Sequence, residues 1–205
     1  MTFIGNKTIT NHRLCIVAVV LCAVALTGCN MFQPRDPDPP GTDSDKIPWR
    51  PANDAAGIFA NLTSGIENLD GVNYDRTLSD GGFNFIALDQ DVIDINDPRA
   101  FADWSKEVEV DVLNLMLSES RAASVTFNRI VNINQIEYVQ FRVTYELKLV
   151  AKTNGEETAY KGIAEFDVRR NAGIWELELW RDVERVENFT TWGYLKGALR
   201  LRLLS

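Results

Sequence analysis

The chain has 205 residues, 29 Asp+Glu against 21 Lys+Arg, and a formal net charge of −8, and so acidic a chain repels the phosphate backbone of a nucleic-acid partner. Its one histidine, His12, and its three cysteines, Cys15, Cys22 and Cys29, all lie within the first 29 residues. The chain beyond Cys29 therefore has no side chain for Ser-His-Asp or Cys-His catalysis, an intrachain disulfide or a His- or Cys-ligated zinc site, and we expect neither a metal nor a cofactor.

The first predicted element is an export signal. Lys7 and Arg13 are the only charged residues before a run of thirteen apolar residues, Leu14–Leu26. A membrane-spanning helix needs about 20 apolar residues, so this run is too short to span and has the length of the apolar part of a secretory signal. Small residues, Thr27 and Gly28, follow where a signal peptidase would cut.

The four residues Leu-Thr-Gly-Cys at 26–29 resemble the lipobox of bacterial lipoproteins. The resemblance implies cleavage between Gly28 and Cys29, a diacylglycerol on the Cys29 thiol and a further acyl chain, such as palmitate, on the new amino group. The lipid would then anchor the protein to a membrane of the cell envelope. Asn30 in place of an aspartate favours the outer membrane or cell surface over the inner membrane. The alternative is an ordinary signal or anchor with an inert cysteine.

A tether follows the predicted lipidation site. Six of the seven prolines lie in residues 30–51, and proline removes backbone donors and favours extended conformations. We expect a spacer with a reach of roughly 20–50 Å, the alternative being a proline-rich ligand for a partner domain. The chain thus divides into a signal at 1–28, a lipidated cysteine and tether at 29–51, and one domain at 52–205.

Helices are predicted in the first half of the domain, where apolar residues recur every three or four positions. In chain order we expect a helix at 55–69, a short helix at 74–78, a strand at 83–88 after a glycine turn, and a long helix that starts at Asp97-Pro98 and carries Phe101, Trp104, Val108, Val112 and Leu115. A strand over 108–112 is the alternative at one point, because the valines there also alternate.

The acidic stretch 89–97 invites comparison with a calcium loop. An EF-hand loop needs oxygen ligands at alternate positions and a glycine at the sixth. The sixth position here is Asp94, and apolar residues interrupt the carboxylates. We therefore interpret the stretch as a solvated loop that leads to the helix cap at Asp97.

Strands dominate the second half. Alternating apolar residues predict strands at 125–133, 139–149, 160–168 and 174–182, with turns at Asn154-Gly155 and at 171–173. In the last strand, alternation places Trp175, Leu177 and Leu179 on one face and Trp180 on the other. The tail 198–205 alternates apolar and basic residues, which predicts an edge strand; the alternative is a segment that docks on a partner or on anionic lipid through Arg200 and Arg202.

Helices followed by antiparallel strands indicate an α+β fold. This order, with IWELELWRD at 174–182 and TTWGYLKG at 190–197, resembles the nuclear transport factor 2-like superfamily, and more narrowly its bacterial lipoproteins, which share a Trp-x-Asp strand end and a Trp-Gly-x-Leu-Lys tail. Over residues 52–197 the resemblance implies a cone in which a curved antiparallel sheet of four to six strands wraps about three N-terminal helices. It also implies an apolar pocket inside, a homodimer through the outer sheet face, and a Trp192 segment that folds back on the sheet as a clasp.

The candidate ligand-binding residues are Tyr145, Tyr160 and Trp104, which we expect to face the pocket and to contact a small apolar ligand; plain core packing is the alternative. We also interpret Trp175, Trp180 and Trp192 as packing residues rather than a sugar-stacking platform. Some enzymes of the superfamily combine an aspartate base with tyrosine, but no acidic residue is expected on the faces of the two tyrosines. The prediction is a non-catalytic ligand-binding or structural and interaction module, the alternative being a lyase or isomerase that uses tyrosine and aspartate in the cone.

Overall fold

The computed structural model describes residues 49–205. The predicted signal, the cleavage site at Gly28 and Cys29, and most of the tether lie outside the described residues. Within residues 49–205, no helix is both long enough and apolar enough to cross a membrane.

The domain is built on one five-stranded sheet. Its strands are β1 (Asn84–Ile86), β2 (Ser120–Asn134), β3 (Tyr138–Ala151), β4 (Glu157–Asn171) and β5 (Ile174–Arg185), in the spatial order β1-β5-β4-β3-β2. The four long strands pair antiparallel, and the short β1 pairs parallel to β5. The α+β class and the sheet of four to six strands are therefore confirmed.

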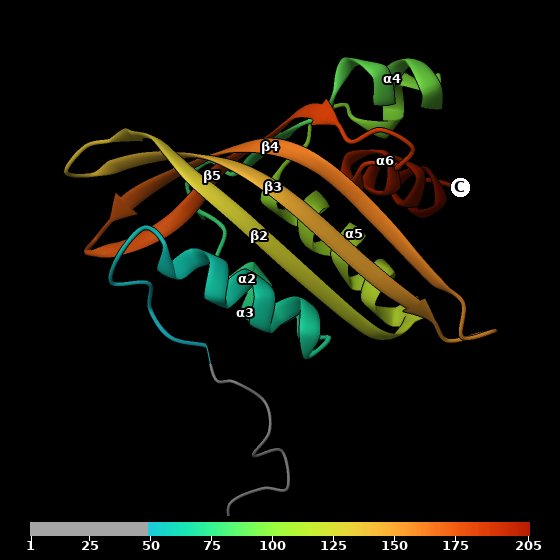
Figure 1. The fold of residues 1–205 in the computed structure, drawn as a ribbon, viewed down its shortest axis with the longest axis horizontal. Helices are drawn as coiled ribbons and strands as arrows, with labels where there is room; N and C mark the ends of the chain where they lie inside the picture. Colours follow the sequence, from blue (N-terminus) through green and yellow to red (C-terminus); the bar gives the residue numbers. More distant parts are fainter. Residues whose placement is uncertain (1–48) are drawn as a thin grey trace, which may run out of the picture. The chain divides into compact units, whose positions relative to one another are not determined.

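Helices cover one face of this sheet. They are α2 (Gly57–Glu67), α3 (Gly71–Asp75), α4 (Asp89–Ile95), the 3₁₀ helix η2 (Pro98–Ala100), α5 (Lys106–Glu119) and α6 (Trp192–Leu203). Figure 1 shows the long strands curving past α2, α3 and α5, with α4 and α6 together at one end of the strands.

Aromatic side chains fill the space between the sheet and the helices. Phe59 of α2 stacks on Phe166 of β4 with ring centroids 5.6 Å apart, and Phe166 lies 4.5 Å from Trp180 of β5. Trp180 in turn meets Trp192 of α6 edge to face at 4.6 Å. Each such ring buries about 150–250 Å², so these contacts form a continuous apolar core from α2 to α6.

The predicted alternation in the last strand is wrong beyond Leu177. Leu177 pairs with Val168 and Leu179 pairs with Asp167, so Glu178 is an extra residue in the ladder. Such a β-bulge shifts the side-chain alternation by one position. Trp180 therefore enters the core on the same side as Leu177, and Asp182 follows it.

The acidic stretch 89–97 is not the predicted loop. Most of it is α4, which ends at Asn96 in the left-handed conformation, with φ 52°. Asp97 caps only the short η2, because its side chain accepts from the backbone of Arg99. The long helix α5 begins instead at Lys106 after the cap Ser105, and it contains residues 108–112, so the strand alternative is wrong.

The C-terminal tail forms a helix rather than the predicted edge strand. The side chain of Thr191 caps α6 by accepting from the Tyr194 N–H at 2.9 Å. Buried residues within α6 recur every three or four positions: Trp192, Lys196 and Leu199. Arg202 at its far end pairs with Glu119 of α5, so this end of the tail packs on the chain's own helix.

Candidate functional site

Four charged side chains lie buried where α6 packs against the rest of the domain. They are Asp91 of α4, Glu109 of α5, Asp182 of β5 and Lys196 of α6, and none has more than 3% of its surface exposed. We call these four residues the ionic cluster. Because charged groups are almost never fully buried unless paired, the partners of each one define what the cluster can do.

Glu109 and Lys196 form a buried ion pair between α5 and α6. The Lys196 Nζ lies 2.7 Å from the Glu109 Oε1. Glu109 also accepts from the Tyr74 hydroxyl at 2.7 Å and from the Trp104 Nε1 at 2.9 Å. The carboxylate is thus held by one cation and two donors, which replaces the hydration that it loses on burial.

Aromatic rings surround the Lys196 ammonium. Its Nζ lies 3.7 Å from the ring centroid of Trp180, 4.2 Å from that of Phe85 and 5.2 Å from that of Trp192. The negative face of an aromatic ring attracts a cation, most strongly where water is excluded. Burial nevertheless lowers the pKa of Lys196, and Glu109 opposes that shift.

Asp182 anchors the first turn of α6. It accepts from the Trp180 Nε1 at 2.8 Å, from the Gly193 N–H at 3.0 Å and from the Tyr145 hydroxyl at 3.3 Å. Burial raises the pKa of the Asp182 carboxyl to about 6, against the lowering effects of Lys196 and the hydrogen bonds. A Cβ on Gly193 would stand within 2.4 Å of the Asp182 Oδ2, so this close approach requires glycine.

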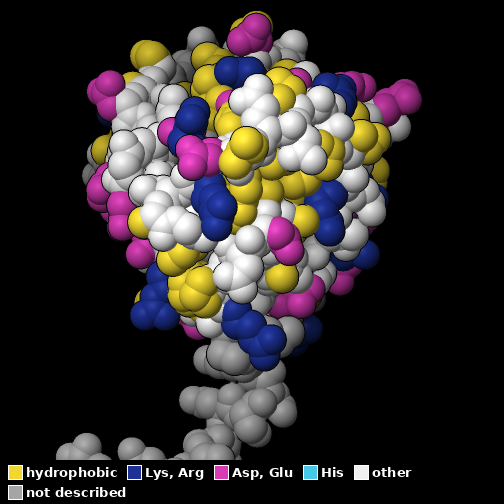
Figure 2. Space-filling model, turned by 90° about the vertical axis from the view of Figure 1, so that its left-hand side faces the viewer, with side chains coloured by type: hydrophobic (Ala, Val, Ile, Leu, Met, Phe, Trp, Pro, Cys, Tyr) yellow, Lys and Arg dark blue, Asp and Glu magenta, His cyan; other side chains and the backbone are white. Residues whose placement is uncertain are grey.

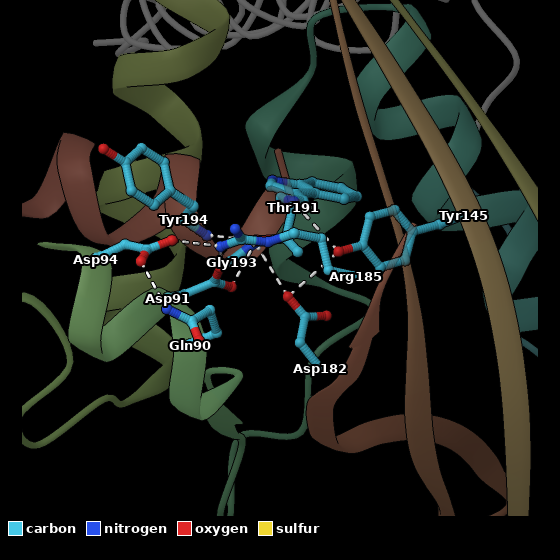
Figure 3. Close-up of polar contacts among 10 residues, drawn as sticks. Gln90, Asp91, Asp94, Tyr145, Asp182, Arg185, Thr191, Gly193 and Tyr194 are labelled. Carbon is cyan, nitrogen blue, oxygen red and sulfur yellow. Dashed lines mark hydrogen bonds and ion pairs between the residues drawn. The ribbon is translucent and has the colours of Figure 1, made fainter. Parts of the chain in front are cut away.

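Asp91 ties α4 to the same place. Its carboxylate accepts from the Thr191 hydroxyl at 2.5 Å and from the Arg185 guanidinium at 2.7 Å. Arg185 also binds Asp94 one helical turn further along, at 2.8 Å. Figure 3 shows these groups converging on the start of α6 from α4, β5 and β3.

The ionic cluster therefore joins α4, α5, α6 and β5 to one another and does not present charged groups to solvent. Each of its charged groups contacts an opposite charge or hydrogen-bond donors of the same chain, and each is buried. In this conformation the carboxylates have almost no surface open to solvent. Residues 49–205 contain no group of three or more His, Cys, Asp or Glu side chains that could hold a metal ion.

The structure places two of the three predicted ligand-binding residues in this region. Tyr145 is buried, donates to Asp182 and accepts from the Trp192 N–H at 3.2 Å. The expectation that no acidic residue shares its face is wrong, because the bulge in β5 turns Asp182 inward. Trp104 lies against Phe85, with centroids 5.1 Å apart.

Tyr160 is not part of this region. It lines a hollow of about 250 Å³ between α5, α6 and the ends of β3 and β4. Trp104 lines another hollow, of about 620 Å³, beside β1 and α4. Both hollows open at the surface, and they share no lining residue.

The ionic cluster is not among the predicted sites, although the sequence contains two signals for it. The Trp-x-Asp strand end supplies Trp180 and Asp182, and the Trp-Gly-x-Leu-Lys tail supplies Trp192, Gly193 and Lys196. In the structure the two motifs contact each other directly. The predicted clasp at Trp192 corresponds to the start of α6.

Comparisons with known proteins identify the fold of the domain. No family model matches the chain, and no curated protein matches it. Three similar solved structures have provisional enzyme names: a scytalone dehydratase and an aromatic ring hydroxylase, both from Novosphingobium aromaticivorans, and a dehydratase of the NTF2-like family from Streptomyces avermitilis.

The identities to these structures are low. They are 8%, 11% and 10%, with TM-scores of 0.53, 0.52 and 0.48. The matches cover 64%, 68% and 64% of this chain and 81%, 92% and 95% of the other chains. At such identities the likeness concerns the fold alone. The domain has the α+β nuclear transport factor 2-like fold, in which N-terminal helices pack against a curved, mostly antiparallel five-stranded sheet.

Proposed function

We propose that this protein is a lipid-anchored component of the bacterial cell envelope whose NTF2-like domain is a non-catalytic interaction module. One observation supports the non-catalytic role of the domain. The ionisable groups inside the cone pair with one another and with hydrogen-bond donors of the same chain, and they hold α6 and α4 in place. A cone used for catalysis needs such groups within reach of a substrate, and here they are buried.

The lipid anchor is supported by the apolar run at 14–26, the Leu-Thr-Gly-Cys segment and the proline-rich tether. Two or three acyl chains are needed for durable anchoring, because one chain binds a membrane only marginally. Substitution Cys29→Ala in the full-length chain, expressed in a bacterium, is expected to abolish labelling with radioactive palmitate and to leave an uncleaved precursor. Cys22→Ala, which lies within the apolar run, is the matched control and should still be labelled. Labelled Cys29→Ala protein would end the lipobox interpretation.

The proposed non-catalytic role is tested first by native mass spectrometry. The protein used is the chain from residue 29 onward, produced without the signal and with Cys29→Ser. We expect the mass of the protein alone. A small molecule that survives purification would favour the ligand-binding version of the module, and the hollow beside Trp104 would be the place to look for it. In that case Trp104→Ala should release the bound mass.

The same spectrum tests the homodimer. The outer face of the sheet carries paired charges, among them Lys161 with Glu146 and Arg181 with Glu165. Burying these charges in an interface carries a desolvation cost, so the composition of this face favours a monomer over the implied dimer.

The alternative function, a lyase or isomerase, is kept because of one specific contact. Tyr145 donates to Asp182, whose pKa of about 6 suits a general base near neutral pH. This chemistry requires α6 to move away and admit a substrate. The Gly193 N–H donates to Asp182, so its hydrogen exchange with solvent reports that motion. Slow exchange in the native state supports a non-catalytic module in which α6 stays in place, whereas fast exchange favours the enzyme.

A further inference from the structure

Two turns lie together at one end of the sheet. The β2–β3 turn and the β4–β5 turn are joined by the hydrogen bond from the Arg170 N–H to the Glu137 carbonyl, 2.9 Å long. We call residues 128–139 and 168–174 the hairpin end. In Figure 1 it projects at the left-hand side, away from α4 and α6.

The hairpin end exposes four large hydrophobic side chains. Ile136, in the β2–β3 turn, is 87% exposed, Ile130 is 70% exposed, and Val131 and Ile133 are exposed as well. These residues lie on or next to β2, an edge strand of the sheet, and residues 130–136 contain neither a charge nor a proline. Exposed apolar edge strands of this kind are association sites unless something covers them.

The charge of the hairpin end is opposite to that of the domain. It carries Arg129, Arg169 and Arg170 against the single acid Glu137, whereas residues 52–205 carry 16 Lys+Arg and 25 Asp+Glu. Arg169 also pairs with Glu178 of β5 at 2.7 Å. Figure 2 looks onto this side of the molecule and shows hydrophobic side chains near the centre, with Lys and Arg side chains and also Asp and Glu side chains around them. Apolar side chains together with the net positive charge of residues 128–139 and 168–174 are complementary to an anionic lipid surface.

The tether enters the domain at this same end. The Ala52 carbonyl accepts from the Trp175 N–H at 3.1 Å. Residues 53–56 line a hollow of about 560 Å³ together with Val131, Asn134 and Arg170 of the hairpin end. Nineteen residues lie between Cys29 and Trp49, so the lipid-bearing segment joins the domain close to Val131 and Arg170 of the hairpin end.

We propose that the hairpin end rests on the surface of a bilayer that contains anionic phospholipid, with Ile130 and Ile136 in the headgroup region and the arginines near the phosphates. The proposal rests on the lipid anchoring proposed above and names the surface that the anchored domain turns to the membrane. A second copy of the chain fits less well, because a two-fold contact would bring the arginines of both copies together.

The contact needs little intrinsic affinity. Each basic side chain near an anionic leaflet is expected to raise binding about fivefold. Tethering then makes the contact intramolecular, at an effective concentration on the order of millimolar. The strand backbone stays in the hydrated headgroup layer, since unpaired peptide groups are not tolerated in hydrocarbon.

The test couples the mature chain to vesicles through Cys29, its only thiol, with a maleimide lipid, which bypasses lipidation by the cell. Vesicles contain either equal parts of phosphatidylglycerol and phosphatidylcholine or phosphatidylcholine alone. Amide hydrogen exchange at residues 130–138 is expected to slow several-fold on the anionic vesicles. Exchange at residues 152–157, in the turn at the opposite end of β3, should stay unchanged.

Ile136→Ser is expected to remove this protection, and Arg170→Ala to weaken it. The matched control is Ile93→Ser, which replaces another exposed isoleucine, 65% exposed, on α4; it should keep the protection. Equal exchange on vesicles and in solution would overturn the proposal and leave the lipid anchor untouched. Protection that arises without vesicles as protein concentration rises would overturn it in favour of self-association, and loss of palmitate labelling in cells bears only on the anchor.

Discussion

Asp182 illustrates how strongly the setting of one residue determines its chemistry. Its carboxyl lies among aromatic rings and accepts two N–H groups and a phenol hydroxyl. Burial still dominates and raises its pKa to about 6, above the value of about 4 of an unfolded chain. Between these two pH values the folded state holds the proton that the unfolded state has lost.

A pH dependence follows with a definite sign. Where the native state binds more protons than the unfolded state, the free energy of unfolding falls as pH rises. Asp182 should therefore lower stability from pH 4 to pH 6, by up to about 3 kcal/mol for a shift of two pH units. Urea unfolding of wild type and Asp182→Asn at both pH values measures this effect, and the difference between them should change in favour of the variant as pH rises.

The control for this experiment is Asp89→Asn, an exposed aspartate on α4. Its difference from wild type should stay nearly constant over the same range. If the stability difference from wild type has the same pH dependence for Asp182→Asn as for Asp89→Asn, the pKa of Asp182 is not raised in the folded protein.

Gly193 permits the contact that Asp182 makes with α6. An added methyl group would stand 2.4 Å from the Asp182 Oδ2 and 3.1 Å from the Asp91 Oδ2. Gly193→Ala is expected to destabilise the protein by about 1–3 kcal/mol, the usual range for an overpacked site. Gly82→Ala, where no atom lies within 4 Å of the added carbon, should differ far less in thermal or urea unfolding.

At the scale of elements, the ion pair of Glu109 and Lys196 joins α5 to α6 through the core. Removing one partner of a buried pair leaves the other charge uncompensated, which typically costs about 3–5 kcal/mol. We expect Lys196→Met to destabilise the domain by about that amount in urea unfolding. Glu109→Gln should restore part of the loss when it is added to Lys196→Met, because the Glu109 carboxylate is then no longer left buried without its cation.

The double-mutant cycle measures the coupling between the two helices. Strictly additive effects of the two substitutions would mean that the pair contributes nothing beyond its separate contacts. The exposed pair of Arg202 and Glu119 joins the same two helices and provides the comparison, since exposed pairs contribute only about 0–1 kcal/mol.

Elements whose side chains alternate regularly could be predicted from the sequence. The strands β3 and β4 and the turn at Asn154-Gly155 occur where alternation and turn chemistry place them. The bulge at Glu178 could not be foreseen, because one extra residue leaves the local sequence pattern unchanged but turns over the side chains of residues 179–182. The C-terminal half of α6 was missed for a related reason: the Leu-Arg alternation at 199–203 mimics a strand, whereas the cap at Thr191 and the burial of Lys196 decide for a helix.

The candidate site could be predicted only in part, because it is assembled from distant segments. Tyr145, Tyr160 and Trp104 were expected to face one pocket; Tyr145 and Trp104 lie within the same aromatic core, whereas Tyr160 lines a separate hollow. Asp91 and Thr191 meet at 2.5 Å although one hundred positions separate them in the chain, and periodicity carries no information about such contacts. A buried lysine also contradicts its usual surface preference, so only the compensating rings and carboxylate explain it.

At the scale of the whole molecule, α6 closes the core that the sheet and the N-terminal helices leave open. Its residues cover Trp180 and Phe85 and supply the only cation of the ionic cluster. Without α6, Glu109 would lose its ion pair with Lys196 and Asp182 would lose the hydrogen bond from Gly193. The rings of Trp180 and Phe85 would become exposed as well. We therefore expect a chain that ends at Phe189 to lose cooperative urea unfolding and near-ultraviolet circular dichroism and to bind the dye ANS, as expanded compact states do.

A shorter truncation isolates the part of α6 responsible. A chain that ends at Arg202 lacks only Leu203, Leu204 and Ser205, which are all exposed, and keeps the cap, Lys196 and the pair with Glu119. It should unfold cooperatively at nearly the wild-type urea concentration. If the chain ending at Phe189 also did so, α6 would be an appendage, the ionic cluster would not stabilise the domain, and a substrate could reach Asp182 and Tyr145. That outcome would favour the enzyme over the interaction module, so this pair of truncations links the stability of the fold to its function.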